Sequence, residues 1–202
     1  MSHSRAWRSY KHGAPVAAAA TGAPVAAGRD PGVRGTRRVL GLDPGSRATG
    51  YGVIDFGAGT TQCIASGTIR AAGTDFAARL RDIYAGVAAV MDTYRPDEIS
   101  IERVFVSRNV SSALKLGQAR GAALAATFAH PVPVFEYAAR EVKLSVVGTG
   151  AAEKVQVQKM VTVLLGLRGR LAADAADALA IALCHIHGET ARALAARAGR
   201  RA

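Results

Sequence analysis

The sequence predicts an α/β fold in which a mixed five-stranded β-sheet is flanked by α-helices. Residues 38–70 hold three short runs rich in β-branched residues, separated by Gly-bearing turns, which indicate an antiparallel meander. Helical and strand-like periods then alternate along the chain. A set of hairpins followed by alternating helices and strands favours a mixed sheet with helices on both faces.

The first elements follow from these patterns in chain order. Strands are expected in "RVLGLD", "GYGVIDFG" and "CIASGTIR". The clearest helix covers residues 74–94, where Leu80, Ile83, Val87 and other apolar residues fall on one stripe. "RPDEISIE" then predicts a turn and a buried strand that ends at Glu102.

The second half is expected to be mainly helical. "SSALKLGQARGAALAATFA" predicts a helix with Ser111 or Ser112 near its cap. After a turn with two prolines, "VFEY" predicts the fifth strand. Three more helices are expected near residues 138–147, 151–165 and 173–187.

Positive charge is concentrated at the two ends of the chain. The chain has 26 basic residues (Lys and Arg) and 15 acidic residues (Asp and Glu). Residues 1–38 hold seven basic residues and one acidic residue, and residues 189–202 hold four basic residues and one acidic residue. Residues 39–188 therefore carry 15 basic and 13 acidic residues, a net charge of +2 out of a formal charge of +11. Such ends attract polyanions, of which nucleic acid is the usual one.

The chain divides into three predicted parts. Residues 38–188 form the folded domain, residues 189–202 a basic tail, and residues 1–37 a low-complexity extension. Alanine, glycine and charge in the extension favour disorder. A signal or transit peptide is disfavoured because "GAPVAAAATGAPVAAG" is broken by Gly and Pro and lacks Leu. A mis-assigned start, with translation from Val33, is another interpretation.

The two cysteines indicate no disulfide or metal site. Cys63 and Cys184 lie in apolar segments without CxxC or Cys/His ligand spacing, which indicates buried free thiols in a reducing, cytoplasmic compartment. No apolar stretch approaches the roughly 20 residues that span a bilayer. We therefore expect no membrane partner.

Four carboxylates are candidates for one site. Asp43 and Glu102 each end a predicted buried strand, and ligands gather beyond strand ends in sheets with crossover helices. Asp174 and Asp177 share a face of the helix predicted from residue 173. Taken singly, Asp43 could equally start a turn and Asp174 could equally be an N-cap. Glu102 is harder to explain without a partner, because it ends a strand of buried isoleucines.

Converging acids point to divalent metal ions. Buried together they would repel one another without cations, and hard oxygen ligands suit Mg²⁺. A pair of such ions serves the in-line attack of water on a phosphodiester. The chain has no Ser/His/Asp, HExxH or GxxxxGK[ST] arrangement. His185 and His187 diverge on a helix, so we expect core or surface histidines rather than ligands.

Long motifs across residues 38–188 resemble the RuvC family of bacterial Holliday junction resolvases. They are "LGLDPGSRATGYGVI", "IERVFVSRNVSSALKLGQARG", "VFEYAAREVKLSVVGTGAAEKVQVQKMV" and "DAADALAIALCHIH". The resemblance implies an RNase H-like fold, a homodimer, and cleavage of two opposing strands of a four-way DNA junction in recombination and repair. It also implies two Mg²⁺ per active site, with Mn²⁺ able to substitute, and cooperation with the RuvA and RuvB branch-migration proteins.

The resemblance carries functional residues over by position. The family's catalytic acids fall on Asp43, Glu102, Asp174 and Asp177, which are therefore the expected metal ligands. Its important basic residues fall on Lys143 and Lys154, whose expected role is to neutralise phosphates near the cut.

The loop and helix after Glu102 are implied to serve DNA binding and dimerisation. Phe105 matches the family's aromatic beside the glutamate, implied to stack on bases, although composition alone fits a core residue. Arg108 and Asn109 continue that loop and are expected DNA contacts. Gly117 and Gly121 have GxxxG spacing, which permits close helix approach, and this helix lies near the dimer interface in the family.

Three other functions stay open at the level of sequence. Actin-like and sugar-kinase ATPases share a DxG loop after a strand, but they need a second lobe of similar size. An RNase H-like nuclease that acts on RNA precursors shares the "LDPG" opening, whereas "DAADALA" and "SALKLGQARG" argue against it. A non-catalytic junction-binding module would not need four acids.

Overall fold

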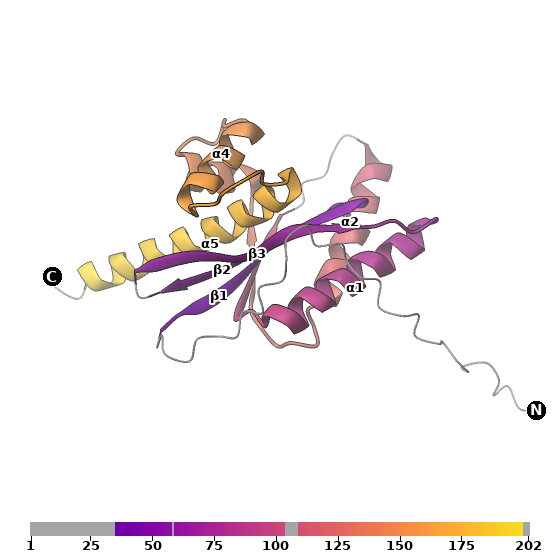
Figure 1. Ribbon diagram of the computed structural model, residues 1–202, viewed down its shortest axis with the longest axis horizontal. Coiled ribbons are helices and arrows are strands. Elements are labelled where there is room, and N and C mark those ends of the chain that lie inside the picture. The colour runs from indigo at the N-terminus through magenta and orange to yellow at the C-terminus, as the bar shows by residue number, and fades with distance from the viewer. Residues whose placement is uncertain (1–34, 58, 104–108, 200–202) are drawn as a thin grey trace, which may run out of the picture.

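A single mixed β-sheet lies between two layers of helices in the computed structural model, which describes residues 35–57, 59–103 and 109–199 (Figure 1). The strand order is β3-β2-β1-β4-β5. β1 pairs antiparallel with β2, and β2 with β3, whereas β1, β4 and β5 run parallel. The predicted mixed five-stranded sheet is confirmed. The strands are β1 (Arg37–Asp43), β2 (Ala48–Gly57), β3 (Thr60–Arg70), β4 (Glu98–Glu102) and β5 (Val134–Tyr137).

Helices cover both faces of the sheet and enclose two hydrophobic cores. α1 (Phe76–Tyr94) and α2 (Val110–Ala125) pack on one face. α5 (Ala173–Ala198) crosses the other face, and α3 (Ala139–Val147) and α4 (Lys154–Leu164) pack outside it. α1 and α2 each return the chain to the sheet and α5 packs back across it, which brings distant carboxylates to the same edge.

The middle of the central strand β1, residues 39–42, is apolar because it is buried on both faces. Val39 packs in the core beneath α5, whereas Leu40 and Leu42 pack in the core beneath α1 and α2. Asp43 is the first acidic residue after this buried run and ends the strand. The rigid strand therefore fixes the place of its carboxylate.

Two predicted helix boundaries were wrong. Ser111 and Ser112 lie in the first turn of α2, near its cap as predicted, and the cap itself is Asn109, whose side chain accepts a hydrogen bond from the Ser112 amide at 3.1 Å. α4 begins at Lys154 rather than at 151, after a capping box in which the Glu153 amide donates to Gln156 Oε1 at 2.7 Å. α5 ends at Ala198, not at 187, and so continues into the segment predicted as a basic tail.

The cysteine prediction agrees with the structure. Cys63 and Cys184 are both free thiols, the first partly buried and the second buried. Burial raises the pKa of each thiol to about 11, so both stay protonated at neutral pH. Within the described ranges, none of the helices combines the length and the hydropathy that a membrane crossing requires.

Candidate active site

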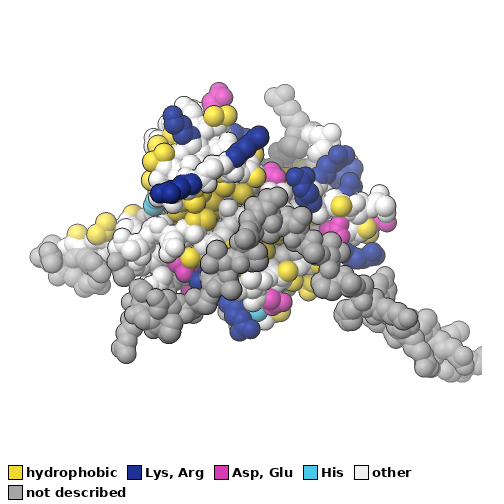
Figure 2. Space-filling model, in the orientation of Figure 1, with side chains coloured by type: hydrophobic (Ala, Val, Ile, Leu, Met, Phe, Trp, Pro, Cys, Tyr) yellow, Lys and Arg dark blue, Asp and Glu magenta, His cyan; other side chains and the backbone are white. Residues whose placement is uncertain are grey.

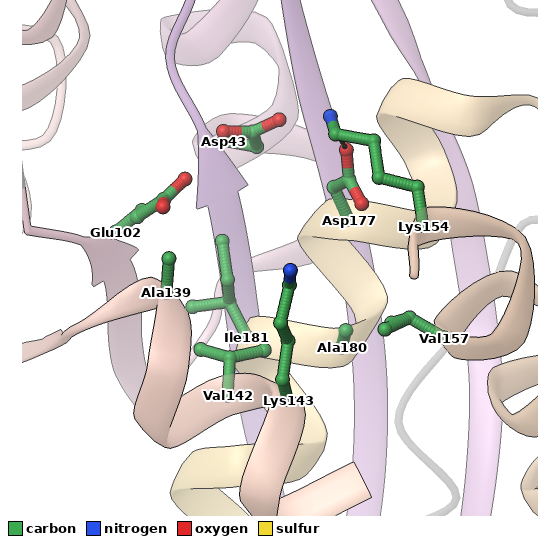
Figure 3. Close-up of a pocket in the computed structure, with 10 residues that line it drawn as sticks. All are labelled: Asp43, Glu102, Ala139, Val142, Lys143, Lys154, Val157, Asp177, Ala180 and Ile181. Atoms are coloured by element: carbon green, nitrogen blue, oxygen red, sulfur yellow. Dashed lines mark hydrogen bonds and ion pairs between the residues drawn. The ribbon is translucent and has the colours of Figure 1, made fainter. Parts of the chain in front are cut away.

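A pocket of about 130 Å³ opens where β1 and β4 end, beside the first turns of α5 (Figure 3). Acidic and basic side chains form one part of its wall and apolar side chains the rest. The lining residues are Asp43, Glu102, Asp177, Lys143, Lys154, Ala139, Val142, Val157, Ala180 and Ile181. Five of the six predicted catalytic residues therefore meet in one place.

Asp43 has the most perturbed carboxyl group of the pocket. Its pKa is raised from 3.8 to about 7, first by desolvation and then by the negative charges of Glu102 and Asp177. A hydrogen bond with the Glu102 carboxyl, which requires a proton on one of the two groups, raises the pKa further. The charge of Lys154 opposes these effects but does not cancel them. The pocket thus holds more negative charge than its own cations neutralise.

Glu102 is brought beside Asp43 by the parallel pairing of β1 and β4. Leu42 is opposite Ile101 in that pairing, so the next residue of each strand is one of the two acids. Ile99 and Ile101 are fully buried and anchor β4 in the core. Glu102 was expected to need a partner because it ends a strand of buried isoleucines, and Asp43 is that partner.

The two acids of α5 are placed differently. Asp177 lines the pocket, whereas Asp174 is half-buried in the first turn and is not among the lining residues. The N-cap of α5 is Ala172, so the interpretation of Asp174 as an N-cap was wrong. An acid in this position still interacts favourably with the helix dipole.

Close contact between α5 and the sheet brings Asp177 to the pocket. A Cβ atom on Gly41 would lie 2.0 Å from the Ala178 carbonyl oxygen, and one on Gly50 would lie 2.0 Å from the Asp174 carbonyl oxygen. Only glycine therefore fits at these two positions of β1 and β2. Sequence reasoning missed this role, although glycines within otherwise β-branched strands were its signal.

Both predicted lysines reach the pocket. The Lys154 ammonium, at the start of α4, lies 2.9 Å from a carboxylate oxygen of Asp177, and the lysine side chain is 81% exposed. The hydrogen bond to Asp177, and then the negative charges of Asp177, Asp43 and Glu102, raise the pKa of Lys154. Lys143 extends from α3 toward the same space (Figure 3). Two cationic side chains thus line the acidic pocket.

The predicted DNA-binding residues are only partly described. Phe105 and Arg108 lie outside the described residues. Asn109 caps α2 with its side chain, which gives it a structural role in addition to any contact with DNA.

The histidines lie outside the pocket, as expected. His185 is fully buried and forms hydrogen bonds of 2.7 Å with Tyr137 Oη and Glu98 Oε2, while His187 is exposed. In the part of the chain that the structure describes, no three Asp, Glu, His or Cys side chains converge closely enough to form a ready-made metal site. The pocket carboxyls interact electrostatically without surrounding a common point.

Comparison with known proteins gives a consistent family. A family described as crossover junction endodeoxyribonuclease RuvC matches residues 39–185. The protein of that description from Methylococcus capsulatus is 55% identical over 150 residues, covering 74% of this chain and 90% of the relative. The one from Chromohalobacter salexigens is 53% identical over 163 residues, covering 81% and 88%.

Solved structures agree with the fold. RuvC of T. thermophilus in complex with a Holliday junction substrate superposes with a TM-score of 0.70 at 35% identity, covering 76% of this chain and 94% of that one. The yeast mitochondrial Holliday junction resolvase superposes with a TM-score of 0.57 at 15% identity, covering 78% and 81%, which supports the fold alone.

Proposed function

This chain belongs to the RuvC family of crossover junction endodeoxyribonucleases and is a Holliday junction resolvase, and we propose that the carboxylate pocket is where it cuts DNA. The observation that carries the proposal is the meeting of Asp43, Glu102 and Asp177 in one pocket, although they come from three elements far apart in the sequence. The reaction would be hydrolysis of one phosphodiester in each of two opposing strands of a four-way junction, in recombination and repair.

We propose that the four acids hold two Mg²⁺ ions, for which Mn²⁺ can substitute. The donor set fits: carboxylate oxygens are hard ligands, and the pKa of Asp43 is raised by burial and then by the neighbouring negative charges, whose repulsion a divalent cation would relieve. Asp43, Glu102 and Asp177 would hold the ions, together with Asp174. When bound, such ions activate the attacking water and stabilise the leaving oxygen.

The two lysines would act on the phosphates. Lys154 is exposed enough to leave Asp177 and approach a phosphate, and Lys143 points into the same space. An ammonium group is a compact charge that neutralises phosphate without fixed geometry. Both residues would therefore lower the cost of bringing the DNA backbone to an acidic pocket.

The surface around the pocket supports DNA binding. Figure 2 shows Lys and Arg side chains gathered over α4 and, separately, near α2. Basic groups of this kind give the salt-dependent part of DNA affinity. Phe105, Arg108 and Asn109 are proposed contacts at the junction itself.

A homodimer would explain two symmetric cuts. Val110 and Leu114 on α2 are 73% and 65% exposed, and they line a shallow hollow with Ala113, Gly117 and Gln118. Large apolar side chains exposed together mark a protein contact. Two copies related by a two-fold axis would present identical sites to like strands. RuvA and RuvB are the further partners that we propose.

Cleavage of synthetic DNA tests the proposal. The wild-type chain should nick a four-way junction in Mg²⁺ and leave a linear duplex and structured RNA uncut, with no reaction in EDTA. Asp43→Asn should reduce the cleavage rate by about 1,000-fold or more, because the variant lacks one proposed metal ligand. The Kd for the junction should change less than threefold. Wild-type cleavage by Asp43→Asn would contradict the metal proposal. Preferred cleavage of structured RNA would favour the RNA-precursor nuclease, and ATP hydrolysis would favour the actin-like ATPase.

A further inference from the structure

One arginine is attached to the main chain of the proposed active site. Arg120 extends from α2, and its side chain is only 18% exposed. Its Nε donates a hydrogen bond to the main-chain carbonyl of Glu102 at 3.3 Å, and its Nη2 donates to Glu136 Oε1 at 2.6 Å. Nothing in the spacing of "GQARG" distinguished this residue in the sequence.

These contacts hold the peptide group that follows Glu102. The carbonyl of Glu102 and the amide of Arg103 belong to one planar unit. Arg120 binds the carbonyl, and the Arg103 amide donates to the Tyr137 carbonyl at 2.8 Å. With both polar groups bound, this peptide plane cannot turn about the backbone of Glu102. Because backbone dihedrals limit which side-chain rotamers are allowed, this also limits the directions in which the Glu102 carboxylate can point.

The charge of Arg120 is already matched within the protein. Glu136 accepts from Arg120 at 2.6 Å and faces Arg103 Nε at 3.9 Å through its other oxygen. A guanidinium is suited to two such contacts because its donors form a rigid fork. A partly buried arginine that is already paired is a poor phosphate ligand compared with an exposed cation.

We propose that Arg120 is a positioning residue for DNA cleavage, which acts by fixing the peptide after Glu102 and so limiting the directions of that carboxylate. The inference rests on the proposed role of the carboxylate pocket. It adds a residue that touches neither the DNA nor the metal ligands' carboxylates.

Single-turnover cleavage of prebound junction separates this role from DNA binding. Arg120→Ala should slow the cleavage step at least tenfold at saturating Mg²⁺ and change junction Kd less than threefold. Arg120→Lys should recover part of the rate, because an ammonium can reach the carbonyl or Glu136 but not both. Lys115→Ala is the matched control: it removes an exposed charge from the same helix, so it should weaken binding slightly and leave the cleavage step unchanged.

Glu136 gives a second test that does not remove the arginine. Glu136→Gln should slow cleavage less than Arg120→Ala, and the double variant should be no slower than Arg120→Ala alone, because both changes act through one contact. If Arg120→Ala does not fold, as judged by its thermal transition, Arg120→Lys and Glu136→Gln carry the test.

Two results would overturn the inference. One is a wild-type cleavage step in Arg120→Ala, or in both Arg120→Lys and Glu136→Gln if the alanine variant does not fold. The other is an equal loss in Kd and in rate, which would make Arg120 a DNA contact. The wild type and Glu102→Gln are assayed in parallel as controls. If the wild type does not cut junctions, or if Glu102→Gln remains active, the proposed function is contradicted rather than the role of Arg120.

Discussion

Asp43 couples the stability of the metal-free protein to pH. Its pKa is about 7 in the folded chain against 3.8 as its ordinary value, so the folded state holds a proton that the unfolded state releases. Between these values the folded state binds more protons, and stability falls as pH rises. This contribution to stability is present in full below pH 4, is lost as the pH rises through 7, and is on the order of 4 kcal/mol.

Asp43→Asn should remove this dependence. In EDTA, the variant and the wild type should have similar free energies of unfolding near pH 4, and the variant should be the more stable one at pH 8. Urea denaturation at both pH values measures the difference. Added Mg²⁺ at pH 8 should stabilise the wild type and leave the variant nearly unchanged, because binding requires the ionised carboxylate. An Asn variant that is less stable than wild type at pH 8 would contradict the raised pKa.

At the same scale, sequence reasoning found some residues of the pocket and missed others. Asp43 and Glu102 follow from strand ends, because burial of the strands is visible as apolar runs. Lys143 and Lys154 came only from the resemblance, since an exposed lysine carries no local signal. Arg120 could not be found, because its role depends on a contact with a main-chain carbonyl 18 positions earlier in the chain.

Among the elements, α5 depends most on close contact with its neighbours. Its first turns lie against β1 and β2 at glycines, and a methyl group on Gly50 would meet the Asp174 carbonyl oxygen at 2.0 Å. The main chain of β2 at Gly50 and the main chain of α5 at Asp174 are each held in a regular element, so neither can move aside alone. The start of the helix would therefore be displaced together with Asp174 and Asp177.

Gly50→Ala should destabilise the fold by about 2–4 kcal/mol and reduce cleavage more than junction binding. Gly188→Ala is a matched control within α5, since its methyl group would have ordinary contacts of 3.6 Å or more with Arg192. That variant should be stabilised by about 0.5–1 kcal/mol, because alanine favours a helix interior. Thermal unfolding and single-turnover cleavage measure both effects. A Gly50→Ala chain with wild-type stability would show that the helix does not rest on this strand as described.

The predicted end of α5 at residue 187 falls just before Gly188. A glycine after an apolar run is a common helix stop. The helix instead continues, because Ala, Leu and Arg beyond it are strong helix formers and Glu189 pairs with Arg192 one turn later. A local stop signal is overridden when strong helix formers lie on both sides of it.

At the scale of the whole molecule, the alternation of helices and strands predicted the mixed sheet but not the strand order. β1 lies at the centre because it pairs antiparallel with β2 and parallel with β4. The β1–β2 pairing follows from the predicted meander, whereas the β1–β4 pairing is long-range and leaves no mark beyond the two-sided burial of "VLGL". The convergence of the acids at one edge could be expected from strand ends, whereas the distance between α5 and the sheet could not.

The exposed apolar face of α2 predicts how the two cuts are linked. If two copies meet through Val110 and Leu114, a charge at Leu114 would be buried without a partner in the dimer. Leu114→Asp should therefore be a monomer by light scattering at concentrations where wild type is a dimer. Val163→Asp is the control, because Val163 is 67% exposed on α4, away from this face, and should stay dimeric.

Cleavage of a plasmid that carries an extruded cruciform measures the consequence of losing the dimer. Wild type should convert the plasmid directly to the linear form, since two symmetric sites cut opposing strands within one bound complex. The Leu114→Asp monomer should accumulate nicked circles, with linear product delayed at least tenfold, because the second cut then needs a second encounter. A monomer that linearises the plasmid at the wild-type rate would show that one copy makes both cuts, and a Leu114→Asp chain that remains dimeric would place the interface elsewhere.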